Sequence, residues 1–335
     1  IGTYSIADNK NTYVYGAELK VASTGSITGN GTLRITGGSK ISQKDGTIDV
    51  ANLHIFDDHG ASYPIIAATY ESADVQIYNN DPVDYGWVPS AGTYTFNGNV
   101  TFTGNTVYTN VYTINNSVNN PNFVFKKNVS FNAGVASTIN WQKGTGTITF
   151  SGSSASTLID SCPSKSDLGK IEINGTDKIL NLGSSVIITS VNVYGGQALA
   201  LGSSGYTVTI TGSGTGINAP FIINGTLDEG TNSTVLYTGT SNTTVPSETF
   251  HNLEIKPASG SPTYDISAGS FGNPSTPVKI DDAGDPGAPA SGSGRHVVRS
   301  SSGNLYTFIN DGGSCEMWKS SDGVSWSEQD ANNNP

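Results

Sequence analysis

The chain has 335 residues, of which only 13% are charged, and its formal net charge is −11 at pH 7. An acidic surface repels a phosphate backbone and no basic cluster opposes this, so nucleic acid is not expected as a partner. The longest nearly apolar run, YPIIAATY at 63–70, is far shorter than the roughly 18 residues of a membrane-spanning helix. We therefore expect no membrane span.

The composition favours an extracellular setting. Lysine is scarce, and glycine, serine, threonine and asparagine carry most of the polar surface. These four residue types suit short strands and turns and weaken helices. The sequence starts at Ile1 inside an alternating pattern, without an initiator methionine or a signal peptide, which indicates a processed product or part of a longer protein. We expect a prokaryotic or viral protein at the cell or virion surface.

Short segments rich in β-branched residues fill most of the chain up to residue 275. They alternate apolar and polar side chains, the pattern of a half-buried strand, and glycine or Asn-Gly closes most of them. No window sustains the spacing of an amphipathic helix, so this region is predicted to be all-β. The clearest segments are GSITGNGTLRITGGS (25–39), NVTFTG (99–104), FVFKKNVSF (123–131), GTITFSG (146–152) and YTVTITGSG (206–214).

The spacing of these strands favours a solenoid. Successive strands from residue 147 onward start about 13 to 23 residues apart, and one coil of a parallel β-helix takes about 20 residues. The phrases NLGSS and ALGSSG are close to a literal repeat, and repeats of this kind must stack to bury a continuous core. We predict a right-handed parallel β-helix, or solenoid. Tandem β-sandwiches with hairpin turns every 8–12 residues remain the alternative.

The phrases GTITFSG, SETFHNLEI and INGTLDEG carry a family resemblance. Residues 20–275 resemble the Gly/Asn/Thr-rich β-solenoid stretches of bacterial and archaeal surface proteins and adhesins. The resemblance rests on the general composition and patterning of these segments and on no invariant motif. It implies a structural or adhesive role.

Clusters of proline, glycine and acidic residues suggest domain boundaries. NNDPVDYGWVPSAG at 79–92 separates an N-terminal β region (1–90) from the solenoid or sandwich region (91–275). A Pro/Gly/Ser-rich stretch is predicted to be a linker at 276–294, ahead of a final unit at 295–335. The two cysteines, Cys162 and Cys315, fall in different units. We interpret both as unpaired, and their spacing leaves a disulfide open.

The final unit contains four short strand candidates. HVVRS, LYTFIN, CEMWKS and SWSEQD alternate with the turns SSGN, DGGS and SDGV. A meander of four strands over about 40 residues is the size of one β-propeller blade. We therefore predict a single four-stranded, blade-like meander.

The last turn, SSDGVSW at 320–326, matches the pattern S-x-D-G-x-[ST]-W. It resembles the Asp-box of sialidases and related propellers, without the optional residue before glycine. In that family the box lies at the hairpin between the third and fourth strands of a blade. Asp-Gly suits a type I′ hairpin because glycine accepts positive φ, and an aspartate accepts bonds from turn amides. The resemblance assigns a structural Asp-box to Ser320, Asp322, Gly323, Ser325 and Trp326.

The Asp-box resemblance implies no catalysis. Sialidases bind the substrate carboxylate with three arginines, whereas this chain has three in total: Arg34 in the predicted solenoid, and Arg295 and Arg299 in the final unit. One blade cannot close a ring, because propellers need about four to eight. We expect that the blade is truncated and that further blades follow Pro335.

For the other candidate sites, a structural role is favoured over a functional one. Paired Asp57 and Asp58 in FDDHG could serve as the carboxylates of a polysaccharide hydrolase, but a solvated turn is favoured. DDAGD at 281–285 offers oxygen ligands for calcium, yet it lacks an EF-hand loop, and a flexible acidic linker is favoured. The four histidines show no metal-binding spacing. We expect no catalytic residue and no cofactor.

These observations favour a structural or adhesive protein of an extracellular surface, which could be a stalk, a fibre or a surface-layer subunit. We expect it to display a C-terminal propeller and not to be an enzyme. Self-association into a fibre or lattice is expected, with surface glycans as further partners. The strand-like N-terminus GTYSIADNKNTYVYG (2–16) is a candidate for pairing with a neighbouring subunit's sheet edge. The alternatives are a glycan-degrading tailspike or secreted hydrolase, and a non-catalytic glycan-binding module whose exposed tyrosines and tryptophans stack on sugars.

Overall fold

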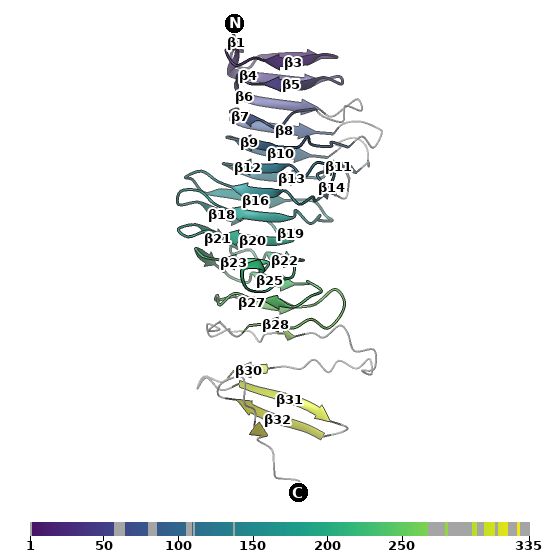
Figure 1. Cartoon of the computed structure of the whole chain (residues 1–335), viewed down its shortest axis with the longest axis vertical. Coiled ribbons are helices and arrows are strands. Elements are labelled where there is room, and N and C mark those ends of the chain that lie inside the picture. Colours follow the sequence, from purple (N-terminus) through teal and green to yellow (C-terminus); the bar gives the residue numbers. More distant parts are fainter. Residues whose placement is uncertain are drawn as a thin grey trace.

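A computed structural model describes residues 2–56, 64–79, 86–104, 109, 111–136 and 138–266, and five short strands between residues 279 and 328. The described residues form an all-β fold, a parallel solenoid of about 11 stacked coils. Figure 1 shows the strands of successive coils lying on one another along the long axis, with the N-terminus at one end. The predicted solenoid is confirmed. Tandem sandwiches would pair their strands antiparallel, whereas the paired strands described up to residue 280 are parallel.

The largest sheet runs along the solenoid through 11 strands, and each strand pairs with a strand of the next coil. In spatial order these are β1 (Thr3–Ser5), β4 (Ser26–Thr36), β6 (Thr47–Phe56), β8 (Asp74–Tyr78), β10 (Asn99–Thr103), β13 (Val129–Asn132), β16 (Ser156–Asp160), β18 (Ile179–Leu182), β21 (Ala198–Ala200) and β24 (Thr226–Asp228), and β2 (Asn11–Tyr15) also pairs with β4.

Shorter sheets close the other sides of the coils. One contains β7 (Thr69–Tyr70), β9 (Thr93–Phe96), β12 (Asn122–Phe125), β15 (Thr147–Phe150), β17 (Lys170–Ile173), β20 (Ser190–Val193) and β23 (Phe221–Ile223). A second contains β19 (Val186–Ile188), β22 (Thr207–Ile210), β25 (Thr234–Tyr237), β27 (Asn252–Ile255) and β29 (Lys279–Ile280). Three pairs complete the set: β3 (Glu18–Val21) with β5 (Lys40–Lys44), β11 (Tyr112–Asn115) with β14 (Ile139–Gln142), and β26 (Thr243–Thr244) with β28 (Tyr264–Asp265). A 3-10 turn, η1, spans Gly216–Asn218.

The alternation in the sequence decides which side chains enter the core. Parallel strands pair in register, so each inward position stacks on the inward position of the next coil. One interior column runs Leu33, Leu53, Val75, Val100, Val129 and Leu158, all buried. This stacking buries the apolar face that a single coil would leave in water.

Aromatic rings fill the core of the middle coils. Tyr70 stacks on Phe96 with ring centroids 5.5 Å apart, and Phe96 stacks on Phe125 at 5.6 Å. Phe150 continues the column at 5.9 Å from Phe125. Offset stacking of this kind contributes about 0.5–1.5 kcal/mol per pair beyond the area that the rings bury.

The structure bears on the expected boundaries only in part. β8 pairs with β10 and β7 pairs with β9, so the ladders run through residue 90 without a break. β29 lies within the segment predicted as a linker, and it extends the sheet of β27. Most of 276–294 lies outside the described residues, as does DDAGD. The division of the chain into four units remains a prediction.

A separate four-stranded sheet follows in the order β30 (Val297–Arg299), β31 (Leu305–Asp311), β32 (Ser314–Ser320) and β33 (Ser327–Glu328). Its pairs are antiparallel, so the strands form the predicted meander. Ser320 ends β32, whereas Asp322, Gly323, Ser325 and Trp326 lie outside the described residues. The Asp-box itself therefore stays a prediction.

Candidate functional site

Most of the sites predicted from the sequence lie outside the described residues. Asp57 and Asp58 lie outside the described residues, so their proposed role stays a prediction. Among the residues that are described, no group of three histidine, cysteine or acidic side chains is arranged to hold a metal. The same part of the chain contains no helix of the length and hydropathy needed to cross a bilayer. Cys162 is a buried free thiol whose pKa burial raises to about 12.

The outward side chains of β2, β4, β6 and β8 form a cluster that the sequence did not reveal. Register places Tyr13 beside Arg34, Arg34 beside His54, and Phe56 beside Tyr78 on the same face of the large sheet. We call these five residues the Arg34 cluster. They come from four successive coils, so they meet only because the coils stack in register.

Two aromatic rings hold the guanidinium of Arg34. Its Cζ lies 5.9 Å from the centroid of the Tyr13 ring and 5.8 Å from that of Phe56, within the range of cation–π contacts. Its Nε donates to Asn11 Oδ1 over a long 3.4 Å. Within the described part of the chain, no carboxylate forms an ion pair with Arg34. The guanidinium is therefore held between two rings, and it has no ion-pair partner among the described residues.

The other half of the cluster is aromatic and neutral. Phe56 and Tyr78 stack with centroids 4.9 Å apart and planes 10° apart, and His54 meets Tyr78 edge-on at 5.7 Å. Burial, with a further contribution from the charge of Arg34, lowers the pKa of His54 to about 4. Nδ1 of His54 is buried and has no hydrogen-bond partner among the described residues. Arg34 is therefore the only cation of the cluster at neutral pH.

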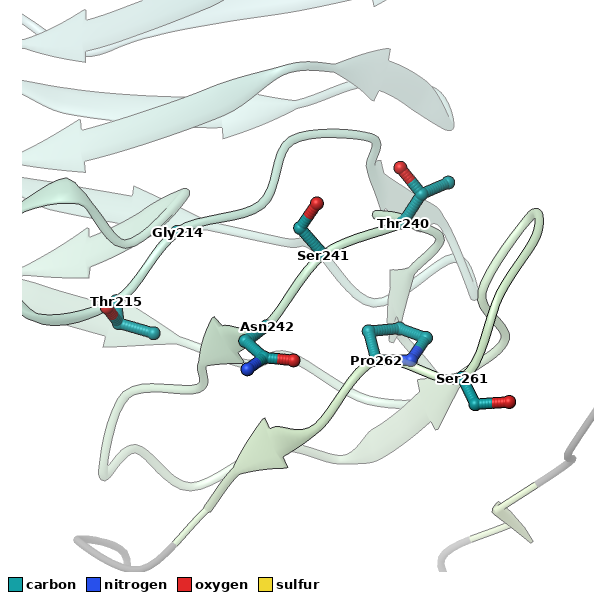
Figure 2. Close-up of a pocket in the computed structure, with 7 residues that line it drawn as sticks. All are labelled: Gly214, Thr215, Thr240, Ser241, Asn242, Ser261 and Pro262. Carbon is teal, nitrogen blue, oxygen red and sulfur yellow. The ribbon is translucent and has the colours of Figure 1, made fainter.

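A shallow polar hollow of about 560 Å³ lies farther along the solenoid (Figure 2). Its lining combines hydroxyl and amide groups with two small turn residues: Gly214, Thr215, Thr240, Ser241, Asn242, Ser261 and Pro262. Asn242 Oδ1 accepts a bond from the backbone N–H of Thr263 at 3.0 Å, which fixes the amide. The hollow can hydrogen-bond a polar ligand, but none of the described residues that line it has an ionisable side chain to transfer a proton.

Buried polar groups elsewhere tie the coils together. Asp167 contacts Lys143, Thr189 and Thr211, which come from neighbouring coils. Lys178 is buried without a carboxylate partner among the described residues, and its Nζ contacts the chain two coils away. We interpret these charged groups as stabilising the stack of coils, because they contact other coils and do not face a cavity.

The first coil leaves a hydrogen-bonding edge without a partner among the described residues. β1 and β2 pair only with β4, and β3 pairs only with β5. The N–H of Ile6 donates to Thr28 and the C=O of Gly2 accepts from Ser26, so the even-numbered residues of β1 face β4. Because peptide groups alternate along a strand, those of Thr3 and Ser5 face away.

The same alternation applies to β2. The carbonyl of Lys10 accepts from the N–H of Thr32, so the peptide groups of Asn11, Tyr13 and Tyr15 face outward. Tyr15 is 73% exposed and Tyr13 is 60% exposed. Among the described residues, the first coil therefore presents exposed aromatic rings and backbone donors that have no strand partner.

Comparisons with protein-family models, curated proteins and solved structures find no significant match to this chain. No relative transfers a role to the Arg34 cluster, the hollow or the open edge.

Proposed function

We propose that this protein is a structural and adhesive component of an extracellular surface, a rod that associates end to end and carries its C-terminal unit away from the surface. The observation that supports this most directly is the open edge of β1, β2 and β3. An unpaired edge of parallel strands is a template for another strand, and proteins without such a use normally block it.

The occupant we assign to the edge is a second copy of this chain. The paired strands of the solenoid are parallel, so the first coil of one copy can continue the ladders of the last coil of another. Within the described residues, β28 and β29 are the last strands of their sheets, and each leaves its far edge unpaired. Such a head-to-tail contact is heterologous and does not close, so it extends into a fibre.

Ser5→Pro tests the contact. Proline removes an outward N–H of β1 and leaves the bonds of Gly2 and Ile6 to β4 in place, as edge positions tolerate. We expect sedimentation velocity to show large assemblies for the native sequence and for the matched Ser5→Ala variant, and a monomer for Ser5→Pro. Equal assembly of all three proteins, or monomers throughout, would contradict the proposal.

The C-terminal meander is proposed to be one blade of an Asp-box propeller, displayed by the rod. Support comes from the antiparallel order of β30 to β33 together with Asp322 and Gly323 between β32 and β33. Gly323→Ala should cost about 1–2 kcal/mol, because a type I′ turn requires a positive φ at this position and alanine disfavours it. Hydrogen exchange should then accelerate in β32 and β33 alone. Unchanged exchange would remove the hairpin assignment.

A further inference from the structure

We propose that the outward face of β2, β4, β6 and β8 binds a carboxylated glycan, with Arg34 holding a sugar carboxylate and neighbouring tyrosine rings stacking on the sugar. This goes beyond the proposed structural role, because it assigns a ligand and a site to one face of the first coils. The site does not depend on end-to-end assembly.

Arg34 supplies the charge selectivity. It is the only arginine before residue 295 in a chain of net charge −11, so a cation held on this face is unusual. The rings of Tyr13 and Phe56 fix the guanidinium without neutralising it. Arginine can bind a carboxylate with two parallel hydrogen bonds, and an ordered side chain loses little entropy in doing so.

The charged neighbours leave the guanidinium available. The carboxylate of Asp74 lies in the adjacent row and accepts from Asn99 Nδ2 at 2.8 Å. The imidazole of His54 is neutral at pH 7 because its pKa lies at about 4. Among the described residues, then, Arg34 has no competing anion bound to it.

The ring of Tyr15 is positioned to stack on a sugar ring. Its ring packs closely against Gly37, where a β-carbon would come within 2.5 Å of a ring atom. Gly37 also has a φ of +66°, a conformation that side chains other than glycine's disfavour. Contact with Gly37 therefore supports the ring, while 73% of the residue remains exposed and available to a sugar.

The row geometry favours a polymer over a small anion. Outward positions repeat at the strand spacing, about 4.8 Å, so Tyr13, Arg34, His54 and Gln76 form a straight row along the solenoid axis. A neighbouring row holds Asn52 and Asp74, whose polar groups can bond hydroxyls. Apolar ring faces, repeated hydroxyl partners and one carboxylate contact together describe an acidic sugar chain.

The test uses a panel of oligogalacturonate, alginate, hyaluronan and sialyllactose, each also as its methyl ester, which keeps the sugar and removes the charge. We expect calorimetry to show binding of at least one acid and at least tenfold weaker binding of its ester. Arg34→Gln should remove that preference, and Tyr15→Ala should weaken the acid and the ester alike. Lys170→Gln, which removes an exposed cation from a different sheet, should change neither.

Three results would overturn the site: no binding across the panel, equal binding of acids and esters, or unchanged binding by Arg34→Gln. Tight binding of polyglutamate at the same residues would instead assign an acidic peptide and would also overturn the glycan proposal. Repeating the titration on Ser5→Pro separates the two proposals. We expect full glycan binding by the unassembled protein, because Ser5 is not part of the Arg34 cluster.

Discussion

At the scale of single residues, Lys178 shows how a solenoid tolerates a buried charge. The residue is fully buried, and its Nζ lies 2.9 Å from the carbonyl oxygen of Lys126 and 2.8 Å from that of Ser154. Ser156 Oγ is a third partner at 2.5 Å. Three partners match the three donors of an ammonium group, and the acceptors come from earlier coils. The side chain of Lys178 therefore links consecutive coils through its hydrogen bonds.

Lys178→Met should destabilise the fold by about 2 kcal/mol, because two carbonyls lose a buried donor and methionine cannot replace it. Urea unfolding measures the change, and exposed Lys127→Met is the matched control, expected within about 0.5 kcal/mol of the native protein. If Lys178→Met were as stable as Lys127→Met, the stabilising role assigned to Lys178 would be wrong.

The pH dependence of this difference has a definite sign. Burial lowers the pKa of folded Lys178 to about 8, whereas the unfolded chain keeps its proton up to the ordinary value of 10.5. Between these values the unfolded state binds more protons, so stability from this residue rises with pH. The stability gap between the native protein and Lys178→Met should therefore widen from pH 8 to pH 10.

At the scale of elements, alternation predicted the strands, whereas the choice of a solenoid depended on the spacing of the strands and on the NLGSS and ALGSSG repeat. GTITFSG contains β15, and FVFKKNVSF contains most of β12 and most of β13, which the turn at Lys126–Asn128 separates. Alternation is a local signal, so it finds half-buried strands. It is identical in a sandwich and in a solenoid, and therefore it could not choose between them.

The Arg34 cluster was missed for the same reason. Tyr13, Arg34 and His54 are roughly 20 residues apart in the sequence, one coil each, and meet only through parallel register. A slip of one residue in any coil would turn these side chains into the core. Aligning TYVY, TLRIT, NLHIF and VQIY as successive coils would have brought them together, but register was the missing information.

The aromatic column gives a prediction for a coil's core. Phe125 contacts Phe96, Phe123 and Phe150, so Phe125→Ala leaves a cavity and should cost about 3–5 kcal/mol. Val124→Ala, the half-buried neighbour on the same strand, should cost far less. Chemical denaturation compares the two variants. Similar midpoints would mean that the column does not support the stack.

At the scale of the whole molecule, the solenoid is a rod whose length follows from its coil number. About 11 coils at about 4.8 Å each give a length on the order of 50 Å. Figure 1 shows the first coil, with β1 and β3, at one end of this stack. Each coil contacts mainly its neighbours, so the same interactions that join coils within one chain can join chains.

Negative-stain electron microscopy tests the central claim most directly. The native protein and Ser5→Ala should form filaments one solenoid wide, and Ser5→Pro should appear as single short rods. Isolated rods in all three samples, or filaments that persist in Ser5→Pro, would contradict end-to-end assembly through the open edge of the first coil.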